Sequence, residues 1–222
     1  HFGHSGIRQH CPETRNFALV EEMDIAIMCA INERVGKNDI LYILGDFAVS
    51  SDPEYVEHCF RMLNGRKILV LGNHDLDRRG RVRKDIADLP WDRPPTHALE
   101  TTDEGCRIYM HHYACRTWPA MHRGSYHLFG HSHGSLPPLG RSRDVGIDCA
   151  DTHFAPMTFR EIQKSLMSVD PAWHASLVTA FGAAVPSLES FRCRPVLQTI
   201  VWSMYSDLEA RGLLQSVRII GI

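Results

Sequence analysis

The sequence predicts a layered α/β fold, in which helices cover a β-sheet. Helical and extended patterns alternate along the first third of the chain in the order helix, strand, helix, strand, which is typical of this class. The extended stretches are short apolar runs, as expected for strands that are buried on both faces. A length of 222 residues, with 44% hydrophobic and 23% charged residues, is enough for one globular domain with a large core and an appendage.

Two helices and two strands are predicted in the first part of the chain. Residues 16–35 place their apolar side chains on one helical face. Residues 39–44 form the first buried strand, and residues 67–71 form the second. Between these strands, Asp52 and Pro53 have the order of an N-cap and a first helical turn, so we expect a helix to begin there.

The second part of the chain predicts a surface excursion, three strands and a helix. Residues 77–100 are rich in Arg, Asp and Pro, and we assign them to the surface with a short helix over residues 82–89. Thr158 and Glu161 form a capping box, which predicts a helix to about Met167. The strands are expected over residues 106–112, 126–129 and 144–148.

Residues 1–166 and 167–222 differ in character, which predicts a boundary between a domain and an extension. The second range holds two apolar helical stretches and ends in strand-like residues at 217–222, without the Gly and His punctuation of the first range. We therefore expect a mostly helical C-terminal extension. Its apolar helices would pack on the domain edge or on a second copy of the chain, and of these we favour a homodimer.

Charge, hydropathy and cysteine usage limit the partners of the chain. A formal net charge of -2 gives no global attraction to phosphate backbones, so a nucleic-acid or nucleotide partner is possible but has no support from charge. No apolar run approaches the ~20 residues that a membrane span needs, so we expect no membrane partner. Seven scattered cysteines, an odd number without a CxxC pair, favour a reduced, cytoplasmic location.

Polar side chains follow several of the predicted strands at the point where each strand ends. The potential metal ligands among them are Asp46, Asn73, His112, His131 and His133. A carboxylate can bridge two ions, while neutral imidazoles and an amide oxygen can complete their ligand shells. On extended backbone the rings of His131 and His133 would lie on the same side, with Cα atoms about 7 Å apart. The pattern predicts a two-metal site that acts on phosphoesters.

These motifs and their order resemble those of the calcineurin-like metallophosphoesterases. The matching stretches are His1–His4 (HFGH), Gly45–Asp46, Gly72–Asp75 (GNHD), His112–Tyr113 and Gly130–His133 (GHSH). They cover roughly residues 1–166, and together they are far more specific than any one of them alone. The resemblance implies a double β-sheet sandwich flanked by helices, with every ligand on loops at one edge of the sheets.

The resemblance also implies which residues bind the ions. The first ion would be bound by His1, Asp46 and His133, and the second by Asp46, Asn73, His112 and His131. Both would be divalent transition-metal ions, and we favour Mn over Fe, Zn and Ni.

For the reaction, the resemblance implies a hydrolase in which a hydroxide that bridges the two metals attacks phosphorus in a phosphodiester or phosphomonoester. His74 would stabilise the transition state or protonate the leaving oxygen, and Asp75 would orient its ring. His4, Tyr113 and Arg123 lie near the ligand loops in the sequence and are candidates for substrate contact. For each of these three, ordinary packing is the alternative.

The beginning of the sequence departs from the family pattern. The family starts with a strand that ends in Asp-x-His, whereas this sequence starts at the His. Either the natural protein has residues before His1, or the strand-like residues 217–222 fill the place of the strand. We favour the first explanation, because the C-terminal segment carries no Asp. The same departure supports a hypothesis from another class, a non-catalytic scaffold that keeps the fold with an impaired metal site.

Overall fold

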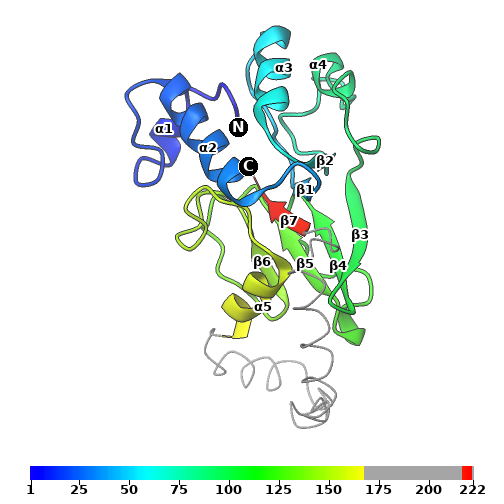
Figure 1. Cartoon of the computed structure of the whole chain (residues 1–222). Coiled ribbons are helices and arrows are strands. Elements are labelled where there is room, and N and C mark those ends of the chain that lie inside the picture. The colour runs from blue at the N-terminus through cyan, green and yellow to red at the C-terminus, as the bar shows by residue number, and fades with distance from the viewer. Residues whose placement is uncertain (168–216, 222) are drawn as a thin grey trace. The chain divides into compact units, whose positions relative to one another are not determined.

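Two β-sheets form the framework of this computed structural model, which describes residues 1–167 and 217–221 (Figure 1). The described strands are β1 (Ile40–Ile43), β2 (Arg66–Leu69), β3 (Ala98–Asp103), β4 (Cys106–His111), β5 (Tyr126–Phe129), β6 (Ser142–Asp144) and β7 (Val217–Ile220). The first sheet has the order β2-β1-β7, with all strands parallel. The second has the order β3-β4-β5-β6, in which only the β3–β4 pair is antiparallel.

Helices cover one face of the first sheet. The described helices are α1 (Ile7–His10), α2 (Val20–Arg34), α3 (Pro53–Met62), α4 (Lys84–Ala87) and α5 (Phe159–Met167), together with the 3-10 helix η1 (Met121–Arg123). Apolar side chains of α2 and α3 share one core with Leu41 and Ile43 of β1. The next residues along the chain, Tyr42 and Leu44, point the other way into a second core, as the alternation of a strand requires.

The second core joins the two sheets. It combines Tyr42 and Ile68 of the first sheet with Ile108, Met110 and Leu128 of the second. The first sheet is therefore buried on both faces, which explains why β1 and β2 are apolar runs rather than alternating patterns. The fold is of the α/β class, as the sequence predicts.

Local sequence signals account for the helix starts. The side chain of Asp52 accepts hydrogen bonds from the amides of Glu54 and Tyr55, at 3.0 and 3.4 Å, so it is the N-cap of α3. At α5, the carboxylate of Glu161 accepts from the amide of Thr158 at 2.7 Å, and the Thr158 hydroxyl accepts from the amide of Glu161 at 3.2 Å. Both predicted caps are confirmed.

The structure also differs from the expected elements. The first half of β3 lies in residues 77–100, which were assigned to a surface excursion. Leu99 is its one buried residue, so its polar side chains hide the strand pattern. The strand expected over residues 144–148 lies earlier, over β6, and gives way to a turn after Gly146. The short helix α1 was not expected.

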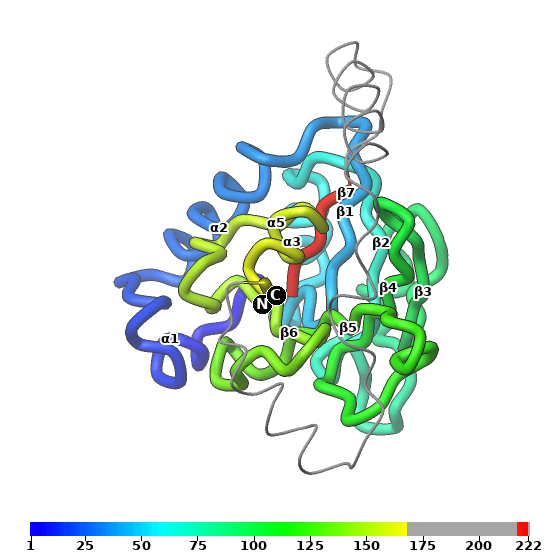
Figure 2. Tube along the Cα trace, turned by 90° about the horizontal axis from the view of Figure 1, so that it is seen from below, coloured from blue at the N-terminus to red at the C-terminus, as the bar shows by residue number. Residues whose placement is uncertain are grey.

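β7 brings a segment from far along the sequence into the middle of the fold. Val217 pairs with Ile40 and Ile220 with Ile43 in a parallel ladder, and Gly221 forms a bridge with Gly146 on the other side. Figure 2 shows β7 beside β1. β7 is therefore the second strand, besides β2, that pairs with β1.

This placement changes the expected domain boundary. β7 belongs to the same compact unit as residues 1–167, whereas the sequence analysis assigned residues 217–222 to a separate extension. The two helical stretches predicted for that extension lie outside the described residues. In the described part of the chain, no helix has the length and apolar character needed to cross a membrane.

Candidate metal centre

The loops that follow β1, β2, β4 and β5 bring the side chains of Asp46, Asn73, His112 and His131 together. Asp46 follows β1 and is 2% exposed. Its Oδ2 atom lies 3.3 Å from Nε2 of His1 and also 3.3 Å from Nε2 of His112. One carboxylate oxygen therefore faces two imidazoles, as a bridging ligand would.

His112 shows that this cluster needs a positive charge. Its Nδ1 atom lies 2.7 Å from the carbonyl oxygen of Leu44, so Nδ1 carries the hydrogen and donates it. In a neutral ring, Nε2 then has a lone pair, yet it faces Asn73 Oδ1 at 3.1 Å, His131 Nδ1 at 3.2 Å and Asp46 Oδ2 at 3.3 Å. Burial would lower the pKa of His112, but the Asp46 carboxylate raises it. A proton or a metal ion would each supply the missing charge.

The distances within the cluster fit a metal better than a proton. Ligands about 2.0–2.2 Å from one ion stand about 3.0–3.5 Å from one another in octahedral or tetrahedral geometry. Nε2 of His112 has this spacing from the facing atoms of Asp46, Asn73 and His131. A proton on Nε2 could serve only one or two of the three neighbours well. The residues present therefore fit the implied ion.

The ligands predicted for the first ion lie beside those predicted for the second. The ring of His1 is 2% exposed and stacks on that of His133, with centroids 5.0 Å apart and an interplanar angle of 25°. His1 contacts the same Asp46 oxygen as His112, a ligand predicted for the second ion. The Nδ1 atom of His133 lies 2.8 Å from Asp148. The structure thus brings all six predicted metal ligands into one continuous region.

Two glycines allow this close approach. A Cβ atom on Gly45 would stand 2.2 Å from Nδ1 of His112, and one on Gly72 would stand 2.3 Å from Oδ1 of Asp46. Both distances are far inside van der Waals contact. Gly45 also has a φ of 96°, which side chains rarely tolerate.

Three predicted ligands have left-handed backbone. Among the described residues, seven non-glycine residues have positive φ, and three of these are Asp46, His131 and His133, at 56°, 63° and 48°. Such conformations persist where surrounding contacts hold them, commonly at functional sites. The expectation of extended backbone at His131 and His133 was therefore wrong. A turn instead directs the His131 ring to His112 and the His133 ring to His1.

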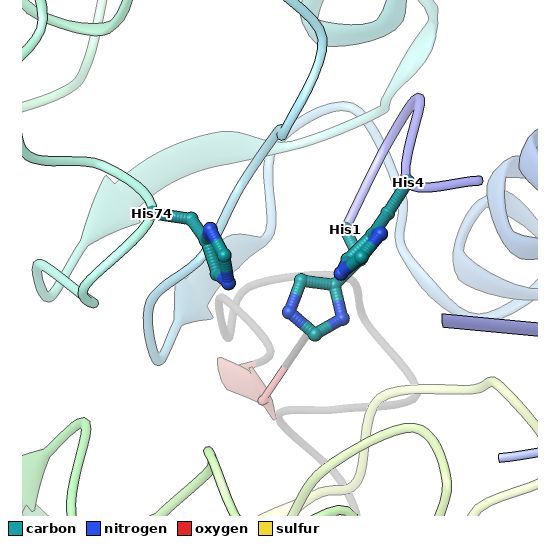
Figure 3. A group of neighbouring side chains, drawn as sticks. All are labelled: His1, His4 and His74. Atoms are coloured by element: carbon teal, nitrogen blue, oxygen red, sulfur yellow. The ribbon is translucent and has the colours of Figure 1, made fainter. Parts of the chain in front are cut away.

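The ring of His74 lies beside the rings of His1 and His4, as Figure 3 shows. The ring centroids are 5.7 Å from His1 and 5.6 Å from His4. The backbone amide of His74 donates to Asp46 Oδ1 at 2.8 Å, which fixes the loop. The ring itself has no hydrogen-bond partner within residues 1–167 and 217–221, and its nitrogen lies within 4.8 Å of ring nitrogens of His1 and His4.

Asp75 does not contact the ring of His74, contrary to the expectation. Its carboxylate is fully buried and accepts hydrogen bonds from the amides of Gly72 and Asp46, both at 2.8 Å, and of Phe47 at 2.9 Å. A carboxylate saturated by three amides holds two loops together. Asp75 therefore fixes the loops after β1 and β2, and the ring of His74 contacts His1 and His4 instead.

The three candidates for substrate contact have different surroundings. His4 accepts the amide hydrogen of Ile7 on Nδ1 at 3.2 Å, and burial, with the charges of His74 and others, lowers the pKa of His4 to about 4. Tyr113 is 42% exposed and donates its hydroxyl to Asn73 Oδ1 at 3.3 Å. Arg123 lies on η1 with an exposed side chain, and none of the contacts that build the cluster involves it.

Sequence reasoning missed a set of supporting residues. Asp148 contacts His133 and also accepts from Thr14 and Arg15. Burial would raise the pKa of Asp148, but bonds from His133 and Arg15 hold it well below its usual range. The available signal was that Asp148, like Asp46, follows an apolar run that ends near a glycine.

A second missed residue, Arg83, braces the loop that carries His74. Its guanidinium donates to the carbonyl oxygens of Ala48 at 2.7 Å, His74 at 3.0 Å and Ser50 at 2.6 Å. It lies within the range assigned to a surface excursion, so only the fold identifies it.

Comparisons with known proteins leave the family open. No protein-family model matches the chain. It is 36% identical over 76 residues to the uncharacterized protein MJ1445 of Methanocaldococcus jannaschii and 39% identical over 79 residues to the Gene 66 protein of Mycobacterium phage L5. Each match covers 34% of this chain, and 42% and 36% of the relatives, so the chain spans less than half of the curated relatives it matches.

A solved structure covers more of the chain. The crystal structure of the protein of unknown function AQ665 from Aquifex aeolicus is similar with a TM-score of 0.53 at 25% sequence identity. The likeness covers 74% of this chain and 94% of that one.

Proposed function

We propose that this chain is a dinuclear, metal-dependent phosphoester hydrolase with the double-sheet sandwich of the calcineurin-like metallophosphoesterases. The proposal rests on the surroundings of Nε2 of His112. Its lone pair faces two oxygens and a nitrogen at 3.1–3.3 Å. A cation makes that arrangement favourable. The equal distances from Asp46 Oδ2 to His1 and His112 support two ions that share one carboxylate.

Six residues would bind the ions in this proposal. The first ion would take His1, Asp46 and His133, and the second would take Asp46, Asn73, His112 and His131. When bound, such ions lower the pKa of water to provide a nucleophile and draw charge from phosphoryl oxygens. Manganese is the favoured metal, with iron, zinc and nickel as alternatives, because a mixed oxygen and imidazole ligand set accepts all four.

Other side chains of the protein would donate protons, stabilise charge and contact the substrate. His74 would protonate the leaving oxygen or stabilise the charge that develops on it. His4 has Nδ1 occupied by the amide of Ile7, so its hydrogen is on Nε2 and can be donated to a substrate oxygen. Tyr113 would contact the substrate beside Asn73.

Hydrolysis assays test this proposal. The purified chain would be stripped of metal, then given bis(p-nitrophenyl) phosphate or p-nitrophenyl phosphate, with and without added Mn²⁺. We expect Mn²⁺-dependent release of nitrophenol from at least one of the two, and the preferred one distinguishes a diesterase from a monoesterase. Release that is independent of metal, or absent with every metal named above, would contradict the proposal.

A non-catalytic scaffold is the competing hypothesis. It predicts that the chain folds but hydrolyses neither substrate, even with metal bound. The half-buried ring of His74, which lies beside the candidate ligand His1, favours the enzyme. A phosphoester substrate, a homodimer and a cytoplasmic location stay predictions, and a nucleic-acid or nucleotide partner stays a possibility that the net charge does not support.

A further inference from the structure

A buried charge pair lies directly behind His133. Arg15 is fully buried, and Asp148 is 7% exposed. The guanidinium donates from Nε to Oδ1 of Asp148 at 2.7 Å and from Nη2 to Oδ2 at 2.9 Å. This two-bond geometry is the strong form of an Arg–carboxylate pair. Removing either partner would leave a buried charge unpaired, so each partner holds the other in place.

The pair determines the tautomer of His133. Oδ2 of Asp148 lies 2.8 Å from Nδ1 of His133, while the hydroxyl of Thr14 donates to Oδ1 at 2.6 Å. A carboxylate that is paired with Arg15 is ionised and can only accept, so the hydrogen must be on Nδ1 of His133. The Nε2 atom then keeps its lone pair, as a metal ligand requires.

The backbone of His133 is held separately from its ring. The carboxylate of Asp144 accepts from the hydroxyl of Ser132 at 2.6 Å and from the amide of Gly134 at 2.9 Å, on either side of His133. These bonds stabilise the turn in which His133 has a φ of 48°. Asp144 thus fixes the turn, and Asp148 is left to fix the rotation of the ring.

An alternative interpretation is that His133, Cys11 and Asp148 form a separate metal site. Nitrogen, sulfur and oxygen atoms of His133, Cys11 and Asp148 lie within 4.8 Å of one another. Asp148, however, already accepts from three side chains, and the Arg15 cation at 2.7 Å would repel a metal ion. A positioning role for Asp148 fits these contacts, and a metal site does not.

We propose that Asp148, held in place by Arg15, is a positioning residue that orients His133 as a ligand of the first metal ion. The inference rests on the proposed function. A carboxylate behind a metal-binding His typically contributes about 10- to 100-fold in metal affinity. Because His133 serves only the first ion, the effect should fall on one ion of the two.

The test compares Mn²⁺ binding by calorimetry in the full chain and in Asp148→Asn. We expect one ion to bind about 10- to 100-fold more weakly and the other to keep its affinity. Asp151→Asn is the control, because Asp151 also accepts two hydrogen bonds from one arginine, Arg143, each at 2.9 Å, and its side chain is 48% exposed and does not contact His133. It should bind both ions as the unchanged protein does.

Further arms separate the explanations. Cys11→Ser should bind both ions normally, and loss of an ion there would support the separate metal site and overturn our proposal. Unchanged binding in Asp148→Asn would also overturn it, as would equal weakening of both ions. If the unchanged protein binds no metal at all, the proposed function itself fails.

A measurement on the metal-free protein keeps the proposal testable should Asp148→Asn fold poorly. The imidazole ¹⁵N spectrum of the unchanged chain should show the Nδ1–H tautomer at His133. A Nε2–H tautomer there would overturn the positioning role, whatever the metal measurements give.

Discussion

At the residue scale, Asp46 connects every part of the candidate site. Oδ2 of its carboxylate faces His1 and His112, while Oδ1 accepts the amide hydrogen of His74. Its own amide donates to Asp75. The sequence motifs predicted the candidate ligands, because five of the six follow β1, β2, β4 or β5 and the loops after these strands meet in the fold. Asp148 and Arg15 were missed because their roles appear only once residues over 130 positions apart meet.

His74 is predicted to act on the substrate and not on the metal. His74→Ala should keep its metal content but lose roughly 10²- to 10⁴-fold in turnover, the usual contribution of a general acid. Elemental analysis and the nitrophenyl assays measure the two effects. His58→Ala, on the exposed surface of α3, is the control and should change neither. Loss of metal from His74→Ala would make His74 a ligand and refute this role.

Gly72 is predicted to be required for metal binding. A Cβ atom at this position would stand 2.3 Å from Oδ1 of Asp46 and 2.8 Å from the His112 ring, so Gly72→Ala must displace one of them. We expect Mn²⁺ affinity to fall at least about tenfold, as it does when the residues that orient metal ligands are lost. Gly36→Ala is the matched control, since its nearest neighbour would be 3.4 Å away. Equal affinity in both variants would show that the site tolerates the methyl group.

At the element scale, β7 links the centre of the fold to the site. The amide of Leu44 donates to the carbonyl of Ile220 at 2.7 Å, and the carbonyl of Leu44 holds Nδ1 of His112 at 2.7 Å. The sequence predicted a strand at the C-terminus and the strands β1, β2, β4 and β5, because their apolar runs are distinctive. Pairing between residues so far apart leaves no local signal, so a place for residues 217–222 in the sheet was only the less favoured alternative, and the β1 partner was not predicted.

Ile219 provides a test of this placement. It is fully buried in the core between the two sheets, so Ile219→Ala should lower the free energy of unfolding by about 2–5 kcal/mol. Chemical denaturation measures the change. Ile25→Ala on α2, where the side chain is 57% exposed, should change it by less than about 0.5 kcal/mol. Matching small effects in both variants would mean that β7 does not occupy the sheet.

At the scale of the whole molecule, the α/β class followed from the alternation of helical and apolar extended patterns. The boundary predicted between residues 166 and 167 lies within one residue of the division between the two compact units, but composition could not reveal that residues 217–221 return to the first unit. The resemblance to the metallophosphoesterases predicted the candidate ligands that the fold brings together, but it did not predict the left-handed backbone at Asp46, His131 and His133.

The oligomeric state remains a prediction at this scale. The apolar helical stretches expected within residues 167–222 favour a homodimer. Light scattering of the full chain should report a mass near twice 25.2 kDa. A mass of one chain at every concentration tested would rule out a stable dimer.

The metal content of the chain tests the central claim most directly. After dialysis against Mn²⁺ and removal of free metal, elemental analysis should find two ions per chain, and none in Asp46→Ala, because one carboxylate serves both ions. Near-ultraviolet circular dichroism would verify that the variant is folded. Two ions bound to folded Asp46→Ala, or none bound to the unchanged chain, would contradict a dinuclear centre built on Asp46.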